Sequence, residues 1–268
     1  MKILCCNIRK NLPEDEASGN GWDARKALCA EVIRTQRADV ICVQECWNVQ
    51  YMDLRSRLPE FDSFGLANPG PEFNPSNAIF FARDRFELIS AGGFWLSETP
   101  HIAGTASWDS AHPRFVNWVH LKGRDSGREF RVWNGHLDHI GQVARERQAQ
   151  LIVQASEVLP EDLPQLFTAD MNADAANPAI EVAKAGGWLD TYAAVHGPED
   201  SGFTFHAFLG PRYAEGRPPD KIKGKIDFIL CRGPVKPLAA EIIRDSRDGR
   251  YPSDHYFLSA EVRLGQGT

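Results

Sequence analysis

The stretch YPSDHYFLSAEV, residues 251–262, joins a polar turn directly to an alternating apolar segment. From residue 256 to residue 264 every second position is apolar, and this period of two predicts a β-strand with one face on a hydrophobic core. Asp254 and His255 stand directly before this strand. An acid and an imidazole at a strand edge are more often structural than functional, so their meaning depends on other residues in equivalent places.

Several further segments read as strands: KILCCNI (2–8), DVICVQE (39–45), 77–96, 115–137, PQLFTAD (164–170) and KIDFILC (225–231). The continuous apolar run in 39–45 is typical of a strand that is covered on both faces. The two long segments are expected to contain consecutive strands, with turns at Arg83–Asp84, at Gly92–Gly93 and over residues 123–127.

Helices are predicted over 23–36, with Asp23 as the cap, over 49–58 and over 142–159. A further helix begins at Asn177-Pro178 and ends at Gly186–Gly187. Since strands predominate and hairpins imply antiparallel pairing, the pattern predicts two packed sheets flanked by helices. No linker-like change of composition interrupts the chain, so we expect one domain over residues 1–268.

The chain of 268 residues has 30 basic and 36 acidic side chains and a net charge of −6. A protein that grips long nucleic acid usually has a basic surplus, because its affinity comes largely from neutralising phosphates. Two local basic runs exist, and for both a solvated face is favoured over a binding surface: Lys221, Lys223 and Lys225, and Arg244, Arg247 and Arg250.

The six cysteines form no CxxC pair and fall mainly in apolar runs, which favours buried thiols in a reducing compartment. The apolar run after Lys2 is too short for a signal peptide, and no apolar stretch reaches the length of a membrane span. We therefore expect a cytoplasmic protein without stable membrane insertion. No obligate protein partner is evident.

Polar residues stand at the ends of most predicted strands: Asn7, Glu45, His136, Asp138, His139, Asp170, Asn172, Asp254 and His255. Asp227 lies inside an apolar strand, where a carboxylate is costly unless it is paired, and His255 is its natural partner. Each residue alone has an ordinary structural explanation. Together they supply oxygen ligands and two imidazoles without a thiol, which suits Mg²⁺ or Mn²⁺ and the attack of water on a phosphodiester. P-loop, GxSxG and HExxH motifs are absent from the sequence.

Six pieces in order resemble the endonuclease/exonuclease/phosphatase superfamily of metal-dependent phosphoesterases: CCNIR, VICVQE, NGHLDH, ADMNAD, KIDFIL and YPSDHY. The segment from Phe94 to Trp118 is similar to a bacterial branch of that group. The resemblance implies an α/β (α+β) protein with the DNase I-like fold, a four-layer α/β/β/α sandwich. It also implies hydrolysis of phosphate esters with Mg²⁺ or Mn²⁺.

The resemblance also implies roles for individual residues. Glu45 would be the main metal ligand, assisted by Asn7 and Asp254, with Gln44 supporting Glu45. The remaining roles are catalytic: Asp170 would activate water, Asn172 would fix its geometry, His136 and His255 would donate to phosphate oxygens, and Asp227 would orient His255.

The candidate substrate contacts are Arg114, His139 and Trp108. A guanidinium such as that of Arg114 matches the geometry of phosphate, although a surface salt bridge is an equal alternative. The loop aromatics Phe73, Trp95, Trp108 and Phe205 could stack on a base or a sugar, but packing is favoured for Trp95 and Phe205. Three positions depart from the family pattern: Ala169 and Met171 stand where glycine and phenylalanine are common, and Arg9 replaces an acidic residue of many nucleases.

The sequence thus predicts a metal-dependent hydrolase of phosphate esters. A phosphodiester is favoured, in a small or single-stranded substrate rather than duplex DNA, because the chain is acidic. Two alternatives remain open: a nuclease for DNA or RNA, and a catalytically silent binding protein on the same fold.

Overall fold

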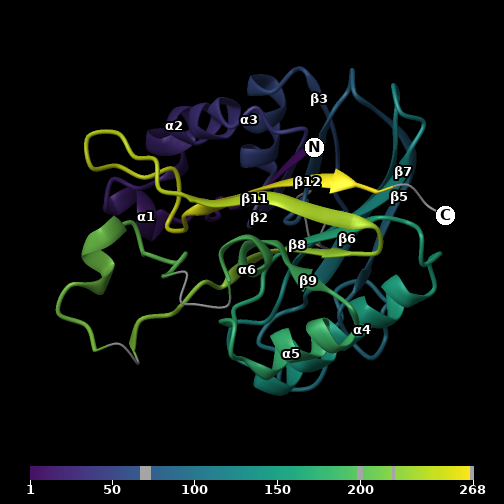
Figure 1. Cartoon of the computed structure of the whole chain (residues 1–268). Helices are drawn as coiled ribbons and strands as arrows, with labels where there is room; N and C mark the ends of the chain where they lie inside the picture. Colours follow the sequence, from purple (N-terminus) through teal and green to yellow (C-terminus); the bar gives the residue numbers. More distant parts are fainter. Residues whose placement is uncertain (67–73, 198–201, 219–220, 266–268) are drawn as a thin grey trace.

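The computed structural model describes residues 1–66, 74–197, 202–218 and 221–265. The strands among these residues form two sheets that pack face to face, and helices cover the outer face of each sheet (Figure 1). This is the predicted four-layer α/β/β/α sandwich, so the predicted fold class is confirmed.

The first sheet has six strands in the order β11-β12-β1-β2-β4-β3. Only β1 and β2 pair in parallel within it, while their neighbours pair antiparallel. The strands are β1 (Lys2–Asn7), β2 (Val40–Gln44), β3 (Phe61–Phe64), β4 (Ile79–Ala82), β11 (Val235–Ile243) and β12 (Phe257–Leu264).

The second sheet also has six strands, in the order β5-β6-β7-β8-β10-β9. Its parallel pair is β7 and β8, and the hairpin predicted over 115–137 is the antiparallel pair β6 and β7. The strands are β5 (Phe86–Trp95), β6 (Phe115–Gly123), β7 (Glu129–His136), β8 (Gln165–Asp170), β9 (Leu189–Asp190) and β10 (Asp227–Arg232).

Two helices pack on each sheet: α2 (Trp22–Thr35) and α3 (Asn48–Arg57) on the first, and α4 (Gln142–Glu157) and α5 (Pro178–Ala185) on the second. The short elements α1 (Pro13–Ala17), α6 (Thr191–His196) and the 3₁₀ turn η1 (Gly210–Ala214) were not predicted. Asn177 caps α5 as predicted, because its side chain accepts a hydrogen bond from the amide of Ala179. Asp23 does not cap α2, which begins behind Gly21, and it pairs with Lys26 instead.

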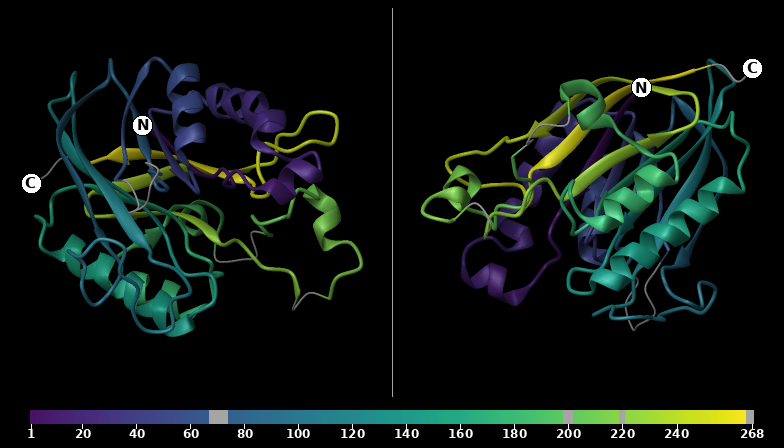
Figure 2. Two further views of the ribbon diagram at one scale, coloured as in Figure 1. Left: turned by 180° about the vertical axis from the view of Figure 1, so that it is seen from behind. Right: turned by 60° about the horizontal axis from the view of Figure 1, so that its bottom comes forward.

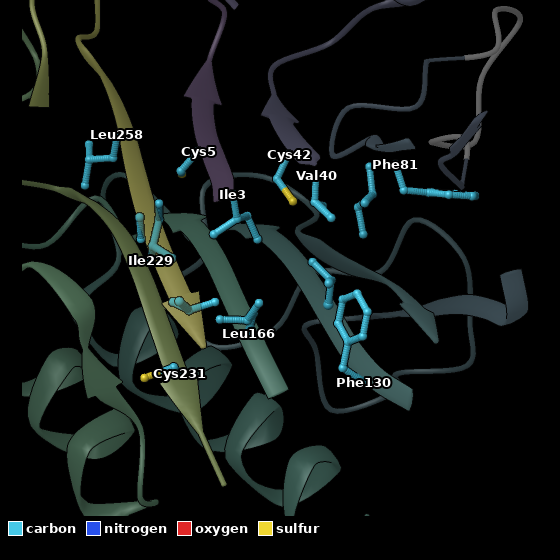
Figure 3. Packing of buried hydrophobic residues seen from close by; sticks show 14 of the residues in the cluster. Ile3, Cys5, Val40, Cys42, Phe81, Phe130, Leu166, Ile229, Cys231 and Leu258 are labelled. Atoms are coloured by element: carbon cyan, nitrogen blue, oxygen red, sulfur yellow. The ribbon is translucent and has the colours of Figure 1, made fainter. Parts of the chain in front are cut away.

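Between the sheets lies a layer of buried aliphatic and aromatic side chains (Figure 3). Ile3 and Val40 of the first sheet meet Phe130, Leu166 and Ile229 of the second, and all five are at most 1% exposed. Burying one such side chain contributes about 1.5–3 kcal/mol. This layer therefore holds the two sheets, and the site at their edge, in a fixed relation.

The strand β12 follows the predicted alternation, since Tyr256, Leu258, Ala260 and Val262 all join the layer between the sheets. Phe257 was not part of that pattern, yet it is 1% exposed and packs under α2 and α3. The strand is thus buried on both faces at its start, because helices cover the outer face of the sheet.

One predicted detail of the region 77–96 is wrong. Gly92 and Gly93 lie inside β5 and do not form a turn. A Cβ at Gly92 would lie 2.7 Å from the ring of Trp118, and one at Gly93 would lie 2.4 Å from the carbonyl oxygen of Val116, so close packing explains both glycines. The turn predicted at Arg83–Asp84 is confirmed, and it connects the two sheets, because β4 and β5 belong to different ones.

The strands β3, β9 and β11 were missed. Strand β11 lies at a sheet edge and contains Pro237, beside which the register shifts. Proline is tolerated at such edges because one side of the strand makes no ladder hydrogen bonds. Its pattern was therefore too weak to predict from the sequence.

The two parallel strand pairs end at the same edge of the sandwich, where Asn7 stands beside Gln44 and His136 beside Asp170. The segment around η1 and the short helix α1 lie at the corresponding end (Figure 2). Among the described helices, none has the length and apolarity needed to cross a membrane.

Candidate active site

Asp170, the last residue of β8, is the centre of the polar cluster. Its Oδ2 accepts a hydrogen bond from Asn7 Nδ2 at 2.9 Å, and its Oδ1 accepts one from the amide of Asn172 at 2.9 Å. Two imidazoles stand near Oδ2, with His136 Nε2 at 3.4 Å and His255 Nε2 at 3.9 Å. The structure thus brings together residues from four separate parts of the chain.

The carboxyl of Asp170 is 2% exposed, and its protonation is shifted. Burial raises the pKa of Asp170 to about 7, and the neighbouring carboxylate of Asp227 adds to this rise. The charge of His255 and the hydrogen bond from Asn172 oppose it. A carboxylate with this pKa can take up a proton near neutral pH, as a general base must.

Glu45 follows β2 directly and has a φ of 58°, an uncommon conformation for a residue with a side chain. Its Oε1 accepts a hydrogen bond from Asn7 Nδ2 at 3.2 Å, and its Oε2 accepts one from the Lys10 amide at 3.0 Å. Burial would raise the pKa of Glu45, but the hydrogen bond from Lys10 and the charge of His255 lower it. Glu45 is therefore held as a carboxylate.

Asp254 stands in the turn before β12. Burial raises the pKa of Asp254, and Glu45 adds to the rise, while the charges of His255 and Arg9 lower it. Arg9 Nε lies 3.8 Å from Asp254 Oδ2 and 2.8 Å from Asp15 Oδ2. Arg9 thus places a cation beside the carboxylate of Asp254.

His255 and Asp227 form the predicted pair, with Nδ1 and Oδ2 separated by 2.9 Å. Burial opposes protonation of His255, but the carboxylate of Asp227, aided by Asp254 and Asp170, raises its pKa to about 10. His255 is therefore an imidazolium at neutral pH. The second oxygen of Asp227, Oδ1, is buried and has no hydrogen-bond partner among the described residues.

His136 is held by Asn172. The Nδ2 of Asn172 donates to the carbonyl of Leu137 at 3.0 Å, which fixes the orientation of the amide, and it lies 2.9 Å from His136 Nε2. Burial and the charge of Arg114 lower the pKa of His136 well below its ordinary value. A neutral His136 therefore accepts from Asn172 through Nε2, and it must gain a proton before it can donate there to a phosphate.

A cavity of about 360 Å³ opens over this cluster. Its walls come from both sheets and from Phe205, Lys223 and Ile226. Its lining includes most of the predicted site residues: Glu45, Arg114, His136, His139, Asp170, Asn172, Asp254 and His255. Asn7 and Asp227 are absent from this lining and instead form hydrogen bonds with Asp170 and His255, which line it. The volume is at the lower end of the range for small-molecule sites.

Of the candidate substrate contacts, two lie at the cavity and one does not. Arg114 and His139 line it, with Arg114 Nη2 at 3.2 Å from His139 Nδ1. Trp108 is absent from the lining. Trp95 is 8% exposed and packs on Phe115, as expected, whereas Phe73 lies outside the described residues.

Several lining residues were not predicted as part of the site: Lys10, Trp47, Asn77, His112, Phe205 and Lys223. Phe205 was expected to pack, and it does contact the His255 ring, but it also faces the cavity. Asn77 is 2% exposed, and its Oδ1 has no hydrogen-bond partner among the described residues. Lys10, Trp47, Asn77 and His112 come from stretches without a motif, so no signal in the sequence marks them. Phe205 and Lys223 carried a weak signal, as a loop aromatic and as part of a basic run, but packing and a solvated face were favoured for them.

Two further predictions need correction. Gln44 does not support Glu45, because its side chain lies between the sheets and donates to Asn134 Oδ1 at 2.6 Å. The basic run 221–225 is not a uniformly solvated face. Lys225 is 4% exposed and lies 3.0 Å from Asp190 Oδ2, while Lys223 lines the cavity.

The donor set at the cavity fits a hard divalent cation. Glu45, Asp170 and Asp254 offer carboxylate oxygens. Burial raises the pKa of Asp170 and of Asp254, and the charges of Asp227 and of Glu45, respectively, add to the rise. Such crowded negative charge, with no thiol among the lining residues, suits Mg²⁺ or Mn²⁺. Asn7 now presents its amide nitrogen to both carboxylates, so direct ligation would require its amide to turn.

Another group could also hold an ion, since ligand atoms of Asp170, Asp227 and His255 lie within 4.8 Å of one another. The 2.9 Å contact between His255 and Asp227 is a hydrogen bond, and an ion between them would have to break it. The carboxylates of Glu45 and Asp254 are therefore the better candidates.

Comparison with known proteins places this geometry in a family. A model of the "Endonuclease/Exonuclease/phosphatase family" matches residues 4–255. The structure of a mannosyl-6-phosphatase from Bacteroides thetaiotaomicron is similar over 98% of this chain and 99% of that one, with a TM-score of 0.86 and 28% identity.

Curated relatives match over shorter stretches. Nocturnin from Drosophila melanogaster is 27% identical over 175 residues, which are 59% of this chain and 25% of that protein. The uncharacterized protein L388 of Acanthamoeba polyphaga mimivirus is 25% identical over 146 residues, 52% of this chain and 54% of its own length. The chain thus spans about half, or less, of these relatives. On the family match, which covers nearly all of its residues, the chain belongs to the endonuclease/exonuclease/phosphatase family.

Proposed function

We propose that this chain hydrolyses a phosphodiester of a small molecule or of a single nucleic acid strand, with Mg²⁺ or Mn²⁺ as cofactor. Members of the family are phosphoester hydrolases and generally use divalent metal ions. The observation that carries the proposal is the position of Asp170, a buried carboxyl at the cavity, held by Asn7 and Asn172 between two imidazoles.

In the proposed reaction Asp170 takes a proton from a water molecule. The water oxygen forms a bond to phosphorus, the bond from phosphorus to the leaving oxygen breaks, and that oxygen takes a proton from solvent. His255, held as an imidazolium by Asp227, donates to a phosphate oxygen and stabilises the developing charge. His136 does the same once the bound anion favours its protonation.

Glu45 and Asp254, with Asn7 if its amide turns, are the residues that would hold the cation. When bound, the ion supplies charge neutralisation at phosphate oxygens. Arg114 and His139 would contact the substrate from the cavity wall. The chain carries a net charge of −6, which is unfavourable for long duplex nucleic acid. The six cysteines are buried as free thiols, which supports a cytoplasmic location.

A second candidate is hydrolysis of a sugar phosphate monoester. It is favoured by one observation, the likeness over 98% of the chain to the Bacteroides mannosyl-6-phosphatase. The two candidates share the same catalytic residues and differ only in the substrate.

The test is product release from bis-p-nitrophenyl phosphate, p-nitrophenyl phosphate, mannose 6-phosphate and a single-stranded oligonucleotide, each with Mg²⁺ and with Mn²⁺. We expect activity that EDTA removes and that Asp170→Asn abolishes. Asp125→Asn makes the same chemical change in the exposed turn between β6 and β7 and is the matched control. Metal-independent activity, or full activity in Asp170→Asn, would overturn the proposal. If the protein binds metal normally by calorimetry but hydrolyses none of these substrates, a catalytically silent binding protein is favoured.

A further inference from the structure

The basic side chains that line the cavity differ in how their charge is balanced. Arg9 lies 2.8 Å from Asp15 Oδ2, and Arg114 Nε lies 3.7 Å from Asp138 Oδ2. Protein carboxylates therefore already balance much of the charge of both guanidinium groups.

Lys10 and Lys223 have no such partner. Neither ammonium group has a carboxylate oxygen within 4.0 Å among the residues that the structure describes. Instead each lies near an aromatic ring, with Lys10 Nζ at 6.0 Å from the Trp47 centroid and Lys223 Nζ at 5.4 Å from that of Phe205. All four side chains line the cavity.

The segments that carry the two lysines also contact the polar cluster around Asp170. The backbone amide of Lys10 donates to Glu45 Oε2 at 3.0 Å. Phe205 contacts the ring of His255, with 5.2 Å between ring centroids. Lys223 stands two residues before Lys225, which the ion pair with Asp190 anchors. The two cation–aromatic pairs are therefore placed relative to the reacting centre.

Lys10 and Lys223 remain once the other charges of the cavity are paired. Arg9 and Arg114 are balanced by Asp15 and Asp138, and a divalent cation would lie against the carboxylates of Glu45, Asp170 and Asp254. A phosphate that reacts at Asp170 carries a charge of about −1.5 to −2 at neutral pH and would face that cation and His255. The two lysines are therefore available for a second anion.

We propose that the substrate carries a second phosphate-type anion besides the phosphate that reacts, and that Lys10 and Lys223 bind it at the aromatic walls of the cavity. The inference rests on the proposed function, because it places the reacting phosphate at Asp170. It narrows the substrate to bisphosphates, nucleotides with an extra phosphate or short phosphodiester strands. A phosphate ester with a neutral leaving group would leave both lysines unused.

The second anion site is tested by measuring ligand binding to a variant that is not expected to hydrolyse the ligand. The Asp170→Asn protein, saturated with Mg²⁺, is titrated in a calorimeter with two matched pairs: glucose 6-phosphate against glucose 1,6-bisphosphate, and thymidine 5′-phosphate against thymidine 3′,5′-bisphosphate. We expect the bisphosphate of at least one pair to bind about tenfold more tightly, a difference of about 1.4 kcal/mol. The advantage should shrink as salt rises, because these lysines are not deeply buried.

The double variant Lys10→Gln/Lys223→Gln, made in the Asp170→Asn protein, should lose the preference for the bisphosphate, so that the bisphosphate and its monophosphate bind equally tightly. Lys122→Gln, on the exposed part of β6, is the matched control and should keep it. The inference is overturned if neither bisphosphate binds more tightly, or if the advantage survives in the double lysine variant.

The proposed function is tested separately, by turnover of p-nitrophenyl phosphate and bis-p-nitrophenyl phosphate in the wild type. If the wild type hydrolyses these esters but neither bisphosphate binds more tightly than its monophosphate, the second anion site is rejected and the proposed hydrolase function stands. If a bisphosphate binds more tightly but the wild type hydrolyses neither ester, the proposed hydrolase function is rejected and the anion site stands.

Discussion

His255 Nδ1 lies 2.9 Å from Asp227 Oδ2, and both side chains are almost completely buried. The aspartate comes from β10 of the second sheet and the histidine from the turn before β12 of the first, so the pair joins the two sheets at the active-site edge. It fixes which nitrogen of His255 faces the cavity and keeps the ring charged.

Asp227→Asn should lower turnover by about 10²–10⁴-fold, because the amide neither stabilises the imidazolium nor enforces its orientation. Steady-state kinetics and thermal unfolding of the variant check this. Asp125→Asn is again the control. Near-normal turnover in a folded Asp227→Asn protein would remove the pair from the mechanism.

Glu45→Gln should abolish the stabilisation of the fold by metal. A cation that binds only the folded state raises stability by about 2.7 kcal/mol at 100 times its dissociation constant. We therefore expect Mg²⁺ or Mn²⁺ to raise the Tm of the wild type, EDTA to reverse this, and Glu45→Gln to lose the rise. Glu87→Gln, on the exposed side of β5, is the control. An equal rise in both variants would place the ion elsewhere.

Arg25 is expected to hold the two loops of the site together. It is 3% exposed and donates to the carbonyls of Asn20 at 2.9 Å, of Pro252 at 3.0 Å and of Arg9 at 2.5 Å, as well as to that of Ile8. Ile8 and Arg9 follow the ligand candidate Asn7, and Pro252 precedes Asp254.

Arg25→Met should therefore destabilise the fold by about 3 kcal/mol or more, because several buried carbonyls lose a charged donor. At a temperature where the variant is still folded, its turnover should fall as well, and Arg25→Lys should restore part of both properties. Arg34→Met, exposed on the same helix, should change neither. Chemical denaturation and kinetics measure the effects, and a stable Arg25→Met protein with weakened turnover alone would contradict the stability argument.

His206 should make the fold sensitive to mild acid. It is fully buried, its Nδ1 accepts from the amide of Gly210, and burial, with the charge of His255, lowers its pKa to about 4. The unfolded chain takes up a proton near pH 6.5, whereas the folded protein does not, so stability falls as pH drops from 6.5 to 4. The full effect is about 3 kcal/mol.

The measurement is the free energy of unfolding between pH 4 and 7 for the wild type and His206→Asn. Asp170 and His255 titrate in both proteins, so the difference between the curves isolates His206. We expect a flatter curve for His206→Asn, and no change of slope for the exposed control His101→Asn. Parallel curves for the wild type and His206→Asn would contradict the assignment.

Local patterns in the sequence predicted the layers and many of their elements. The alternation from Tyr256 to Val262 gave the inner face of β12, and Asn177-Pro178 marked the start of α5. The turn predicted at Gly92–Gly93 was wrong, because glycine also occurs inside a strand that packs closely against a bulky neighbour, here Trp118. Strand β11 was missed because an edge strand with a proline lacks a clear alternation.

The residue types of the candidate site could also be predicted from short stretches of the sequence. Polar residues at strand ends, and a carboxylate inside an apolar strand, are unusual enough to be noticed in the sequence. Their roles as metal ligands, base and phosphate donors remain predictions. Where Gln44 points was not predictable, because one step along a strand decides whether a side chain faces the partner sheet or the cavity.

The sequence by itself therefore determined much of the strand and helix pattern, the family and the acids and imidazoles of the candidate site, because these depend on residue type and short-range spacing. Only the tertiary structure decided which loops complete the cavity. It brought Lys10 with Trp47, and Lys223 with Phe205, to the walls around Asp170. Lys10 and Trp47 follow strands of the first sheet and Asp170 ends a strand of the second, so their arrangement follows from how the two sheets pack, which no local pattern contains.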